Sequence, residues 1–469
     1  MRDIFAWIRH LAEDSQGAMT ELRRDFHRHP EIGWLEMRTS AVIAWKLSEL
    51  GYEVLTGRAV CDDTARMAVP EPEILKRHFK KVQAEAEGKE YAGFLTDDLA
   101  EGFTGVIGIL HGKGGASDEG PVVALRFDID ALPMTESAEE THRPCREGFT
   151  SETPGMMHAC GHDCHAAIGL GTARILAQLK EEWSGTVKLI FQPAEEGTRG
   201  AASIVAAGHL DGVDYFLGTH VAPDDREDDG DFTPGSFGSL ATSKYNVYFQ
   251  GKSAHAGGVP EQGRNAILAA AHAVVGLAGI SRHSGGMSRV NVGVMQGGSA
   301  SNVIADFAML SMEVRGETTE INDFMAKRAG EVCEGAALME GCSCRMELRG
   351  QAPSQTSSPE LVERIAGLAE KHLPYLKVST NHNPRNFGSE DIGFMMDRVQ
   401  KQGGQAVYMR SVTHMESPQH TVCFDVDESV LWKSAAVFAS AVCDLLRKDI
   451  ENCEAADNPA QIREELRDE

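Results

Sequence analysis

The sequence predicts an α/β protein whose mainly parallel sheet is interrupted by a smaller inserted unit. Short apolar runs bounded by glycine and proline alternate with helical stretches, which is typical of α/β layer structures. After about Ser239 the order of elements becomes β-α-β-β-α-β, the order of a split two-helix sandwich. A length of 469 residues is too great for one compact core. We therefore expect two domains, residues 1–239 with 354–469 and residues 240–353.

Two helices and a charged insertion precede the first buried strands. Gly51 is well placed to end the second helix, because glycine readily adopts the left-handed conformation that follows a helix. Residues 56–104 contain a charged, helix-favouring stretch from Glu73 to Glu87, which favours a surface insertion rather than core. The N-terminal helices are predicted at Met19–His27 and Arg38–Leu50.

Strands and helices then alternate up to about Ser239. The apolar runs are short and continuous, as in strands that are covered on both faces of a parallel sheet. The predicted strands are Val106–Leu110, Val122–Phe127, Val187–Phe191 and Tyr215–Thr219, with a helix at Ala166–Leu179.

The inserted unit and the C-terminal part follow in the same way. The insertion is predicted to contain strands at Tyr245–Phe249, Val290–Met295, Ala308–Val314 and Cys344–Leu348, and helices at Asn265–Ile280 and Ile321–Met339. The α/β pattern resumes with a helix at Leu361–His372, a strand around Val407–Tyr408 and a helix near Val430–Leu446.

Composition narrows the function classes. Apolar content of 42% and charged content of 25% are ordinary for a globular protein. A net charge of −25 disfavours nucleic acid and anionic membrane as partners, although a local basic pocket can exist in an acidic protein. The ten cysteines are scattered, which suits a reducing cytoplasm better than a secreted disulfide protein. We read neither a signal peptide nor a membrane span.

The stretch Met157–His165 holds an unusual density of metal-binding side chains. Three histidines, two cysteines and one aspartate lie within nine residues, directly before an apolar helical run. Zinc and neighbouring metals take imidazole, thiolate and carboxylate ligands together, so metal binding is the first function to consider.

Further donors follow the predicted strands. Asp128 and Asp130 come after one strand, Glu195 and Glu196 after another, and His220 after a third. Because ligands bind beyond the carboxyl ends of parallel strands, these segments are expected to converge. They are too many for one ion and suit two ions about 3.5–4 Å apart, which polarise a carbonyl and lower the pKa of a shared water. One of two adjacent glutamates can then bind metal while the other acts as base.

Other residues of this group have simpler interpretations. Cys164 is expected to pack in the helix, and His158 and His165 to be structural or to support the ligands. Asp128 and Asp130 are expected to orient metal-binding imidazoles rather than to bind metal.

These residues carry a resemblance to a known family. The chain resembles the metal-dependent amidohydrolases of the aminoacylase and carboxypeptidase G superfamily, in the branch with indole-3-acetyl-amino-acid, hippurate and p-aminobenzoyl-glutamate hydrolases. The resemblance implies a zinc-peptidase-like catalytic domain with an inserted ferredoxin-like dimerisation or lid domain. The matching segments are Arg24–His29, Arg126–Pro133, Met157–His165, Phe191–Gly197, His220–Val221, Gly251–Gly257, Ser301–Ile304 and Gly388–Ile392.

The resemblance also implies a role for individual residues. Glu195 matches the general base, and His255 matches a histidine that reaches the active site of the dimer partner and holds the developing oxyanion. Asn302 and Arg315 match residues that hold the free carboxylate of the substrate, a task for which the planar arginine fork is suited. The residues that match metal ligands are Cys160, His162, Glu196, His220 and His420.

The substrate is less closely defined than the metal site. Gln419 precedes His420 where many relatives have a second histidine, and residues 413–422 differ from the aminobenzoyl-glutamate enzymes. The insertion at 56–104 and the stretches Leu189–Arg199 and Ser288–Gln296 nevertheless resemble those enzymes. The resemblance implies cleavage of p-aminobenzoyl-glutamate, or of an indole-acetyl, benzoyl or other N-acyl amino acid.

The resemblance finally implies cofactors and partners. It implies two divalent ions, with manganese first as the metal typical of this branch and zinc as the alternative, because a thiolate ligand is compatible with zinc. It implies a homodimer, or a heterodimer with a homologous chain. The alternative from a different class is a non-catalytic partner in such a heterodimer, and the presence of Glu195 with all five ligand matches argues against it.

Overall fold

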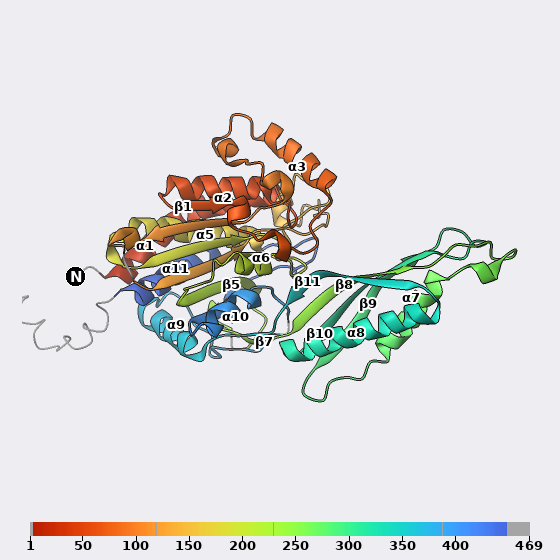
Figure 1. Cartoon of the computed structure of the whole chain (residues 1–469). Helices are drawn as coiled ribbons and strands as arrows, with labels where there is room; N and C mark the ends of the chain where they lie inside the picture. Colours follow the sequence, from red (N-terminus) through yellow and green to blue (C-terminus); the bar gives the residue numbers. More distant parts are fainter. Residues whose placement is uncertain (1–2, 118–119, 228, 387, 448–469) are drawn as a thin grey trace, which may run out of the picture.

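The chain folds into an α/β structure with two separate main sheets (Figure 1). The computed structural model describes residues 3–117, 120–227, 229–386 and 388–447. A seven-stranded sheet lies in the larger part of the molecule, and a four-stranded sheet projects from it on one side. We call the four-stranded sheet with its two helices the small unit (residues 241–352) and the remainder the large unit.

The seven-stranded sheet has the order β1-β2-β4-β3-β5-β13-β6. Its four central strands β4, β3, β5 and β13 are parallel, whereas the edge strands β1, β2 and β6 are antiparallel to their neighbours. The strands are β1 (Glu53–Thr56), β2 (Val106–His111), β3 (Val122–Asp128), β4 (Thr186–Gln192), β5 (Tyr215–Pro223), β6 (Phe232–Thr233) and β13 (Gln405–Thr413).

Two details of this sheet differ from the sequence prediction. The apolar run at Val106–Leu110 forms β2, but β2 runs antiparallel to β4. A continuous apolar run reports that a strand is covered on both faces, and it carries no information about strand direction. The strand that begins at Tyr215 continues to Pro223, so His220 lies within β5 rather than after it.

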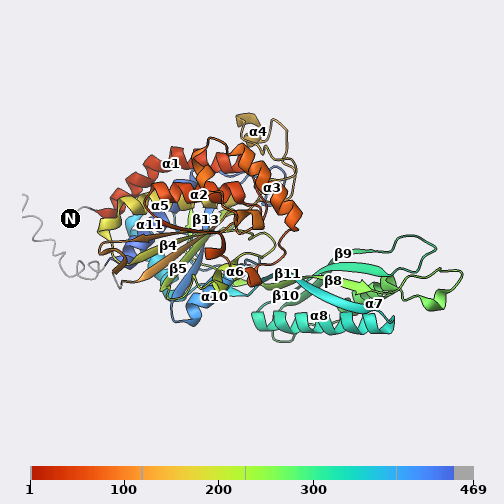
Figure 2. The ribbon, with the colours of Figure 1, turned by 45° about the horizontal axis from the view of Figure 1, so that its top comes forward.

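Helices cover both faces of the seven-stranded sheet. α1, α2, α5 and α11 lie on one face, and α6 and α10 lie on the other (Figure 2). α9 packs beside α11 on the first face. The helices of the large unit are α1 (Ile4–Arg28), α2 (Met37–Glu49), α3 (Pro72–Glu85), α4 (Arg143–Glu147), α5 (His162–Gln178), α6 (Ala201–Ala206), α9 (Pro359–His372), α10 (Gly393–Lys401) and α11 (Val430–Leu446).

The first helix is longer than predicted. α1 begins at Ile4, because the Asp3 side chain accepts hydrogen bonds from the N–H groups of Phe5 and Ala6 at 3.0 and 3.3 Å. Its first turns carry a buried apolar face formed by Ile4, Phe5, Ile8 and Ala12. The sequence prediction began this helix only at Met19 and so missed its N-terminal half.

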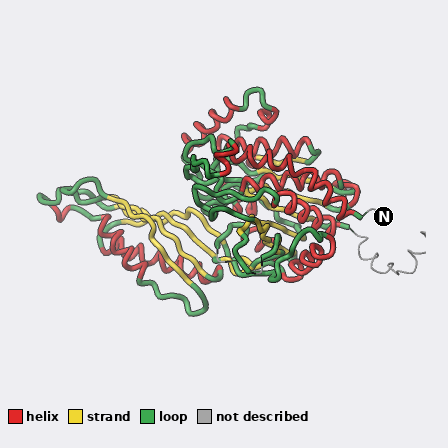
Figure 3. Tube along the Cα trace, turned by 180° about the vertical axis from the view of Figure 1, so that it is seen from behind, coloured by secondary structure: helices red, strands yellow, loops and turns green. Residues whose placement is uncertain are grey.

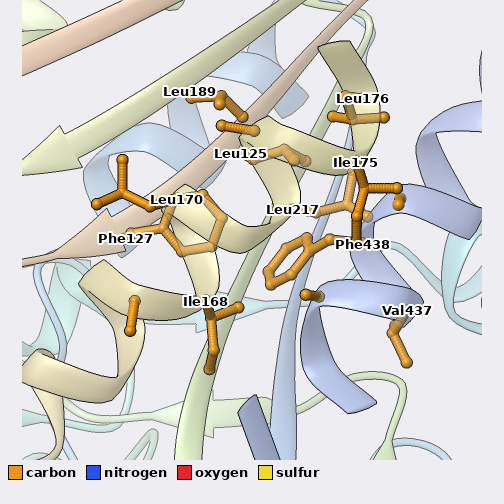
Figure 4. Packing of buried hydrophobic residues seen from close by; sticks show 14 of the residues in the cluster. Leu125, Phe127, Ile168, Leu170, Ile175, Leu176, Leu189, Leu217, Val437 and Phe438 are labelled. Carbon is orange, nitrogen blue, oxygen red and sulfur yellow. The ribbon is translucent and has the colours of Figure 1, made fainter. Parts of the chain in front are cut away.

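The core between α5 and the sheet is tightly packed (Figure 4). A Cβ atom at Gly169 would lie 2.6 Å from Phe191 and 2.8 Å from Phe127, so only glycine allows α5 to approach the strands this closely. Leu125 and Phe127 of β3 face this core, while Ala124 faces the opposite layer. Close packing at this point sets the position of the N-terminus of α5, where the metal-binding motif lies.

The insertion at residues 56–104 packs on the large unit. Helix α3 turns Leu75, Phe79 and Val82 toward Leu35 and Met37 and so forms a small apolar cluster. The charged stretch is therefore one exposed face of an amphipathic helix.

The small unit contains β8 (Ala241–Gln250), α7 (Ala266–Ala278), β9 (Ser288–Gly297), β10 (Phe307–Gly316), α8 (Thr319–Met339) and β11 (Ser343–Ala352). Its strand order is β11-β8-β10-β9, and all neighbours are antiparallel. Both helices pack on one face of the sheet, and the strands are seen from behind in Figure 3. We call the face without helices the open face. The unit connects to the large unit through β7 (Phe237–Ser239) and β12 (Gln355–Thr356), which pair with each other.

None of the helices in the described ranges combines the length and apolar character that crossing a bilayer requires.

Candidate active site

The donor-rich segments meet at one edge of the seven-stranded sheet. Asp128 ends β3, and the loop with Glu195 follows β4. His220 lies in β5, and His162 is the first residue of α5, after Gly161 with a left-handed φ of 103°. This φ explains the glycine between Cys160 and His162, since it is strained for residues with a side chain.

The five predicted ligands lie together in overlapping groups. Donor atoms of Cys160, His162 and His220 lie within 4.8 Å of one another, and so do those of Cys160, Glu196 and His420. Cys160 Sγ is 3.5 Å from His220 Nε2, and His420 Nε2 is 3.4 Å from Glu196 Oε1. A further group joins His162 to Glu195 and Glu196. Because the groups share members, they suit two adjacent ions better than one.

Backbone contacts set the tautomers of the two buried histidines. His162 Nδ1 lies 2.9 Å from the carbonyl oxygen of Asp130, and His220 Nδ1 lies 2.6 Å from that of Val221. A carbonyl only accepts, so both Nδ1 atoms carry the proton and both Nε2 atoms keep a free lone pair. His162 Nε2 is buried and has no hydrogen-bond partner among the described residues.

His165 lies close to the cluster but is fully engaged elsewhere. Its Nε2 accepts the Val221 N–H at 2.9 Å, and its Nδ1 donates to Asp128. Burial would raise the pKa of Asp128, but the Arg126 charge and the histidines outweigh burial and hold it well below its usual value. His165 therefore supports its neighbours and has no lone pair for a metal, as expected from the sequence.

Asp130 joins α5 to the loop of residues 193–200, which we call the catalytic loop because it carries the predicted base Glu195. Its Oδ1 accepts the Glu195 N–H at 3.1 Å and lies 3.2 Å from His162 Nδ1, and its Oδ2 accepts the Glu196 N–H at 2.9 Å. Ala194, at a left-handed φ of 52°, places this turn. One carboxylate thus orients a ligand imidazole and both glutamates, which is the supporting role predicted for it.

Glu195 and Glu196 differ in their surroundings. Glu195 is 7% exposed, and burial raises its pKa well above the usual value, with Glu390 and Asp391 adding to the effect. For Glu196, burial is outweighed by His420 and His162, and its pKa is lowered. Two adjacent carboxyl groups whose pKa values are driven apart are suited to different tasks, one to holding protons and the other to binding cations.

The predicted ligand nearest the C-terminus, His420, lies in a strained loop. His420 has a left-handed φ of 62°, and its N–H donates to the Ala159 carbonyl at 2.7 Å. Gln419 donates through Nε2 to the carbonyl oxygens of Cys160 and Val221 at 3.1 and 3.3 Å. Gln419 therefore ties this loop to the cluster.

Sequence reasoning missed two acidic residues next to Glu195. Burial raises the pKa of Glu390 to about 7 and that of Asp391 to about 6. Asp391 accepts the N–H groups of Gly200 and Ala201, both at 3.0 Å, and so anchors the start of α6. The segment that contains them matched the family, but no spacing or neighbouring donor singled out either residue.

The residues present fit divalent metal ions. His162 Nε2 and Glu196 Oε1 are buried without hydrogen-bond partners in the described part of the chain, and both belong to the donor groups. A buried polar atom without a partner is costly, and a metal ion would satisfy both atoms. The set of thiolate, imidazole and carboxylate donors is compatible with zinc and its neighbours.

The three predicted residues of the small unit do not lie together. The Asn302 carbonyl accepts the Ala256 N–H at 3.0 Å, and His255 bridges to Val303, so both lie in the loops beyond Gln250. Arg315 pairs with Thr242 at the opposite end of β8, next to the large unit. His255 and Asn302 are exposed.

The separation changes one expectation from the sequence. Thr242 and Gln250 are eight positions apart on β8, which is on the order of 27 Å of strand. Within one chain, Asn302 and Arg315 are therefore too far apart to hold the same carboxylate. The resemblance gave their roles but no register, and the sheet register decides the distance.

Comparisons with known proteins find similar sequences and solved structures. The sequence profile of peptidase family M20/M25/M40 matches residues 124–444. Indole-3-acetyl-aspartic acid hydrolase of Enterobacter agglomerans is 43% identical over 88% of this chain and 92% of its own length. A p-aminobenzoyl-glutamate hydrolase chain of Escherichia coli, named as one subunit of that enzyme, is 41% identical over the same shares. The crystal structure of an aminobenzoyl-glutamate utilization protein from Klebsiella pneumoniae superimposes with a TM-score of 0.76 at 37% identity, over 92% of this chain and 97% of that one.

Proposed function

This chain belongs to peptidase family M20/M25/M40 and is a metal-dependent amidohydrolase, and from that premise we propose its substrate and mechanism. We propose that it hydrolyses the amide bond between an aroyl or acyl group and an amino acid, with p-aminobenzoyl-glutamate as the first candidate. The observation that carries the proposal is the buried Glu195 directly beside five side chains that can hold two ions.

Each step of the reaction has a residue suited to it. Two divalent ions held by the five ligands would polarise the scissile carbonyl and lower the pKa of water. Water with a lowered pKa would give up a proton more readily and so become a better nucleophile. Glu195 takes the proton of the attacking water and passes it to the leaving nitrogen. Its buried position excludes bulk water from this proton transfer. His255 donates a hydrogen bond to the developing oxyanion, and Arg315 holds the free carboxylate of the substrate.

The proposed site is built from two chains. His255 and Asn302 lie at the tip of the small unit, far from the donor groups of their own chain, whereas Arg315 lies at its base. A second copy can supply the tip residues while the first supplies Arg315 and the metal ligands. We propose that residues 240–353 form this dimerisation and lid domain, and that residues 1–239 and 354–469 form the catalytic domain.

Apolar side chains on the small unit support a homodimer. Ile267, Leu268 and Val275 of α7 are exposed, and α7 packs beside the edge strand β9. An unpaired edge strand with exposed apolar side chains beside it is a surface that a second chain can cover. A heterodimer with a homologous chain is the alternative, because one relative is named as a single subunit of its enzyme.

The relatives also suggest which substrates to compare. One is named for an indole-acetyl conjugate and the other for an aminobenzoyl conjugate, so the acyl group differs between them. In both names the amino acid is dicarboxylic. An indole-acetyl, benzoyl or other acyl group is therefore the second candidate, and a non-catalytic role is disfavoured by the complete set of Glu195 and ligands.

We further propose manganese as the resident metal, with zinc as the alternative, and a reducing cytoplasm as the location. The nine cysteines in the described ranges are all free thiols, which supports a reducing compartment. The net charge of −25 supports a small-molecule substrate rather than a nucleic acid or an anionic membrane as partner.

A substrate panel tests the proposal. The purified chain, loaded with manganese or with zinc, is incubated with p-aminobenzoyl-glutamate and with indole-acetyl and benzoyl amino acids, and release of the free amino acid is followed. We expect cleavage, with p-aminobenzoyl-glutamate giving the highest kcat/KM. If the chain binds metal but cleaves none of them, and gains activity only with a homologous partner, a non-catalytic role in a heterodimer replaces this proposal.

A further inference from the structure

Basic side chains gather on the open face of the small unit. A cleft of about 490 Å³ is lined there by Arg282, Arg289, Val290, Asn291, Glu313 and Arg315. Arg289 pairs with Arg315 across β9 and β10, so both guanidinium groups lie on the same face. Three arginines and one glutamate leave this cleft positively charged, in a chain whose net charge is −25.

Lys244 extends this basic surface toward the catalytic loop. It lies opposite Glu313 on β10, and on its other side it lies opposite Gly350 on β11. Residues directly opposite each other in a sheet share a face, so Lys244 lies on the open face beside the cleft. Neither the apolar core of the small unit nor its helices include it.

β11 brings Lys244 close to the proposed general base. The Gln351 N–H donates to the Thr198 carbonyl at 2.8 Å. A Cβ atom at Gly350 would lie 2.0 Å from the Gly197 carbonyl oxygen, so the catalytic loop rests directly on this strand. Burial lowers the pKa of Lys244, and the charges of Glu195 and Glu196 oppose this lowering, as expected for a side chain that faces the loop.

Arg315 and Lys244 differ in their partners. Arg315 forms a bidentate pair with Glu313, with Nε and an Nη atom each 3.1 Å from a carboxylate oxygen. Lys244 is partly buried and forms no salt bridge within the described ranges of the chain. Burial lowers its pKa, and the carboxylates of Glu195 and Glu313 oppose that effect. A partly buried ammonium without a paired carboxylate is well suited to receive an anion from a ligand.

Arg315 is proposed to bind one carboxylate of the substrate, and the proposed mechanism gives Lys244 no role. The two side chains are diagonal neighbours on one face, and such neighbours lie about 7–8 Å apart, within reach of long side chains. We propose that Lys244 binds a second carboxylate, the one on the side chain of the leaving amino acid. The inference rests on the proposed amidohydrolase function and names its substrate class, which is N-acyl conjugates of aspartate and glutamate, whatever the acyl group.

A pair of isosteric substrates tests this role. N-benzoyl-glutamate and N-benzoyl-glutamine have nearly the same shape and differ in the charge of the side chain. We expect the wild type to favour the glutamate conjugate, and Lys244→Met to reduce the ratio of the two kcat/KM values by a factor of about 10 or more, the size expected for a hydrogen bond to a charged group. Lys244→Arg keeps the charge and should keep most of the preference.

Product binding gives a readout that does not depend on turnover. Isothermal titration should show tighter binding of free glutamate than of free glutamine to the wild type, and a smaller difference in Lys244→Met. Arg345→Met is the matched control, because Arg345 lies on the same face but opposite Tyr248, farther toward the tip. This control should leave both ratios within about twofold of the wild type.

The outcomes separate this inference from the function on which it depends. The role of Lys244 is overturned if the wild type cleaves the two benzoyl conjugates with equal kcat/KM. It is also overturned if Lys244→Met, with a normal metal content, loses kcat/KM equally for both. Either result leaves the amidohydrolase function standing. Absence of cleavage for every N-acyl amino acid overturns the proposed function itself. If Lys244→Met does not fold, the Lys244→Arg variant and the wild-type preference still decide the question.

Discussion

The two units of the molecule hold their functional residues in opposite ways. In the large unit, His162, Asp128 and Asp130 are at most 1% exposed, and each is hydrogen-bonded to a neighbouring segment. In the small unit, His255 and Asn302 are exposed on loops at the tip. The metal site is thus prepared within one chain, whereas the residues proposed to contact the oxyanion and carboxylate depend on where the small unit, or a second copy of it, is placed.

Burial explains the difference. Ligands that must hold a fixed geometry need a rigid, hydrogen-bonded environment, and Asp130 provides it by joining the segment after β3 to α5 and to the catalytic loop. Residues that meet a diffusing substrate must stay accessible until it binds. The comparison predicts that variants in the large unit act through metal and proton transfer, and that variants in the small unit leave metal binding intact.

The largest expected effect comes from Glu195→Gln. An amide has the shape of the carboxylate but cannot take up a proton, so kcat should fall by a factor of about 10²–10⁴. Metal content, measured by elemental analysis, should stay at the wild-type level because Glu195 is assigned as base and not as ligand. Turnover close to that of the wild type would remove Glu195 from the mechanism.

A somewhat smaller loss is expected for His255→Ala. Removing one donor to an oxyanion costs a factor of about 10²–10³ in kcat. Because the site is proposed to combine two chains, a mixture of His255→Ala with Glu195→Gln should regain activity. Random mixing of symmetric dimers restores one site in each mixed dimer, which gives about a quarter of the wild-type activity.

The mixing experiment distinguishes one-chain from two-chain sites. If the two variants exchange chains, as shown by differently tagged copies, and no activity returns, His255 acts within its own chain or not at all. Two copies of the same variant incubated together serve as the control.

Asp130→Asn should weaken metal binding without abolishing the fold. The amide keeps one acceptor oxygen but loses the other, so either His162 or one of the loop N–H groups loses its partner. Loss of such a supporting group typically lowers metal affinity by a factor of about 10–100. Competition with a chelator measures the change, and the exposed substitution Asp211→Asn is the matched control.

The smallest effect is expected from Asn265→Ala in the small unit. The Asn265 side chain caps α7 by accepting the N–H groups of Ile267 and Leu268 at 3.0 and 3.3 Å. Its removal should lower the free energy of unfolding by about 1 kcal/mol. Hydrogen exchange should increase in α7, and metal affinity should be unchanged. A parallel loss of metal would show that the two units are more closely coupled than the comparison implies.

Much of the metal site could be predicted from the sequence. Cys160 and His162 were recognisable from local donor density, and Glu195 and Glu196 from their place after a strand. These features are local, and the parallel sheet brings its strand ends together without further information. His420 depended on the resemblance, and the structure places it 3.4 Å from Glu196.

Other features could not be predicted, for reasons that are physical. The direction of β2 and the position of His220 inside β5 are not encoded in apolar runs, which report burial alone. Burial raises the pKa values of Glu390 and Asp391, and the charge of Arg126, which is far away in sequence, only partly offsets it. Lys244 reads as an ordinary polar position of an alternating strand.

The sequence by itself determined the class of fold, the change to a β-α-β-β-α-β unit after Ser239, and the donor set around Cys160 and His162, because hydrophobic period and donor spacing are properties of neighbouring residues. Only the tertiary structure decided that Asn302 and Arg315 lie at opposite ends of the small sheet and that Lys244 faces the catalytic loop. Strand register and the packing of β11 on residues 197–198 set those distances, and both arise from contacts between segments far apart in the chain.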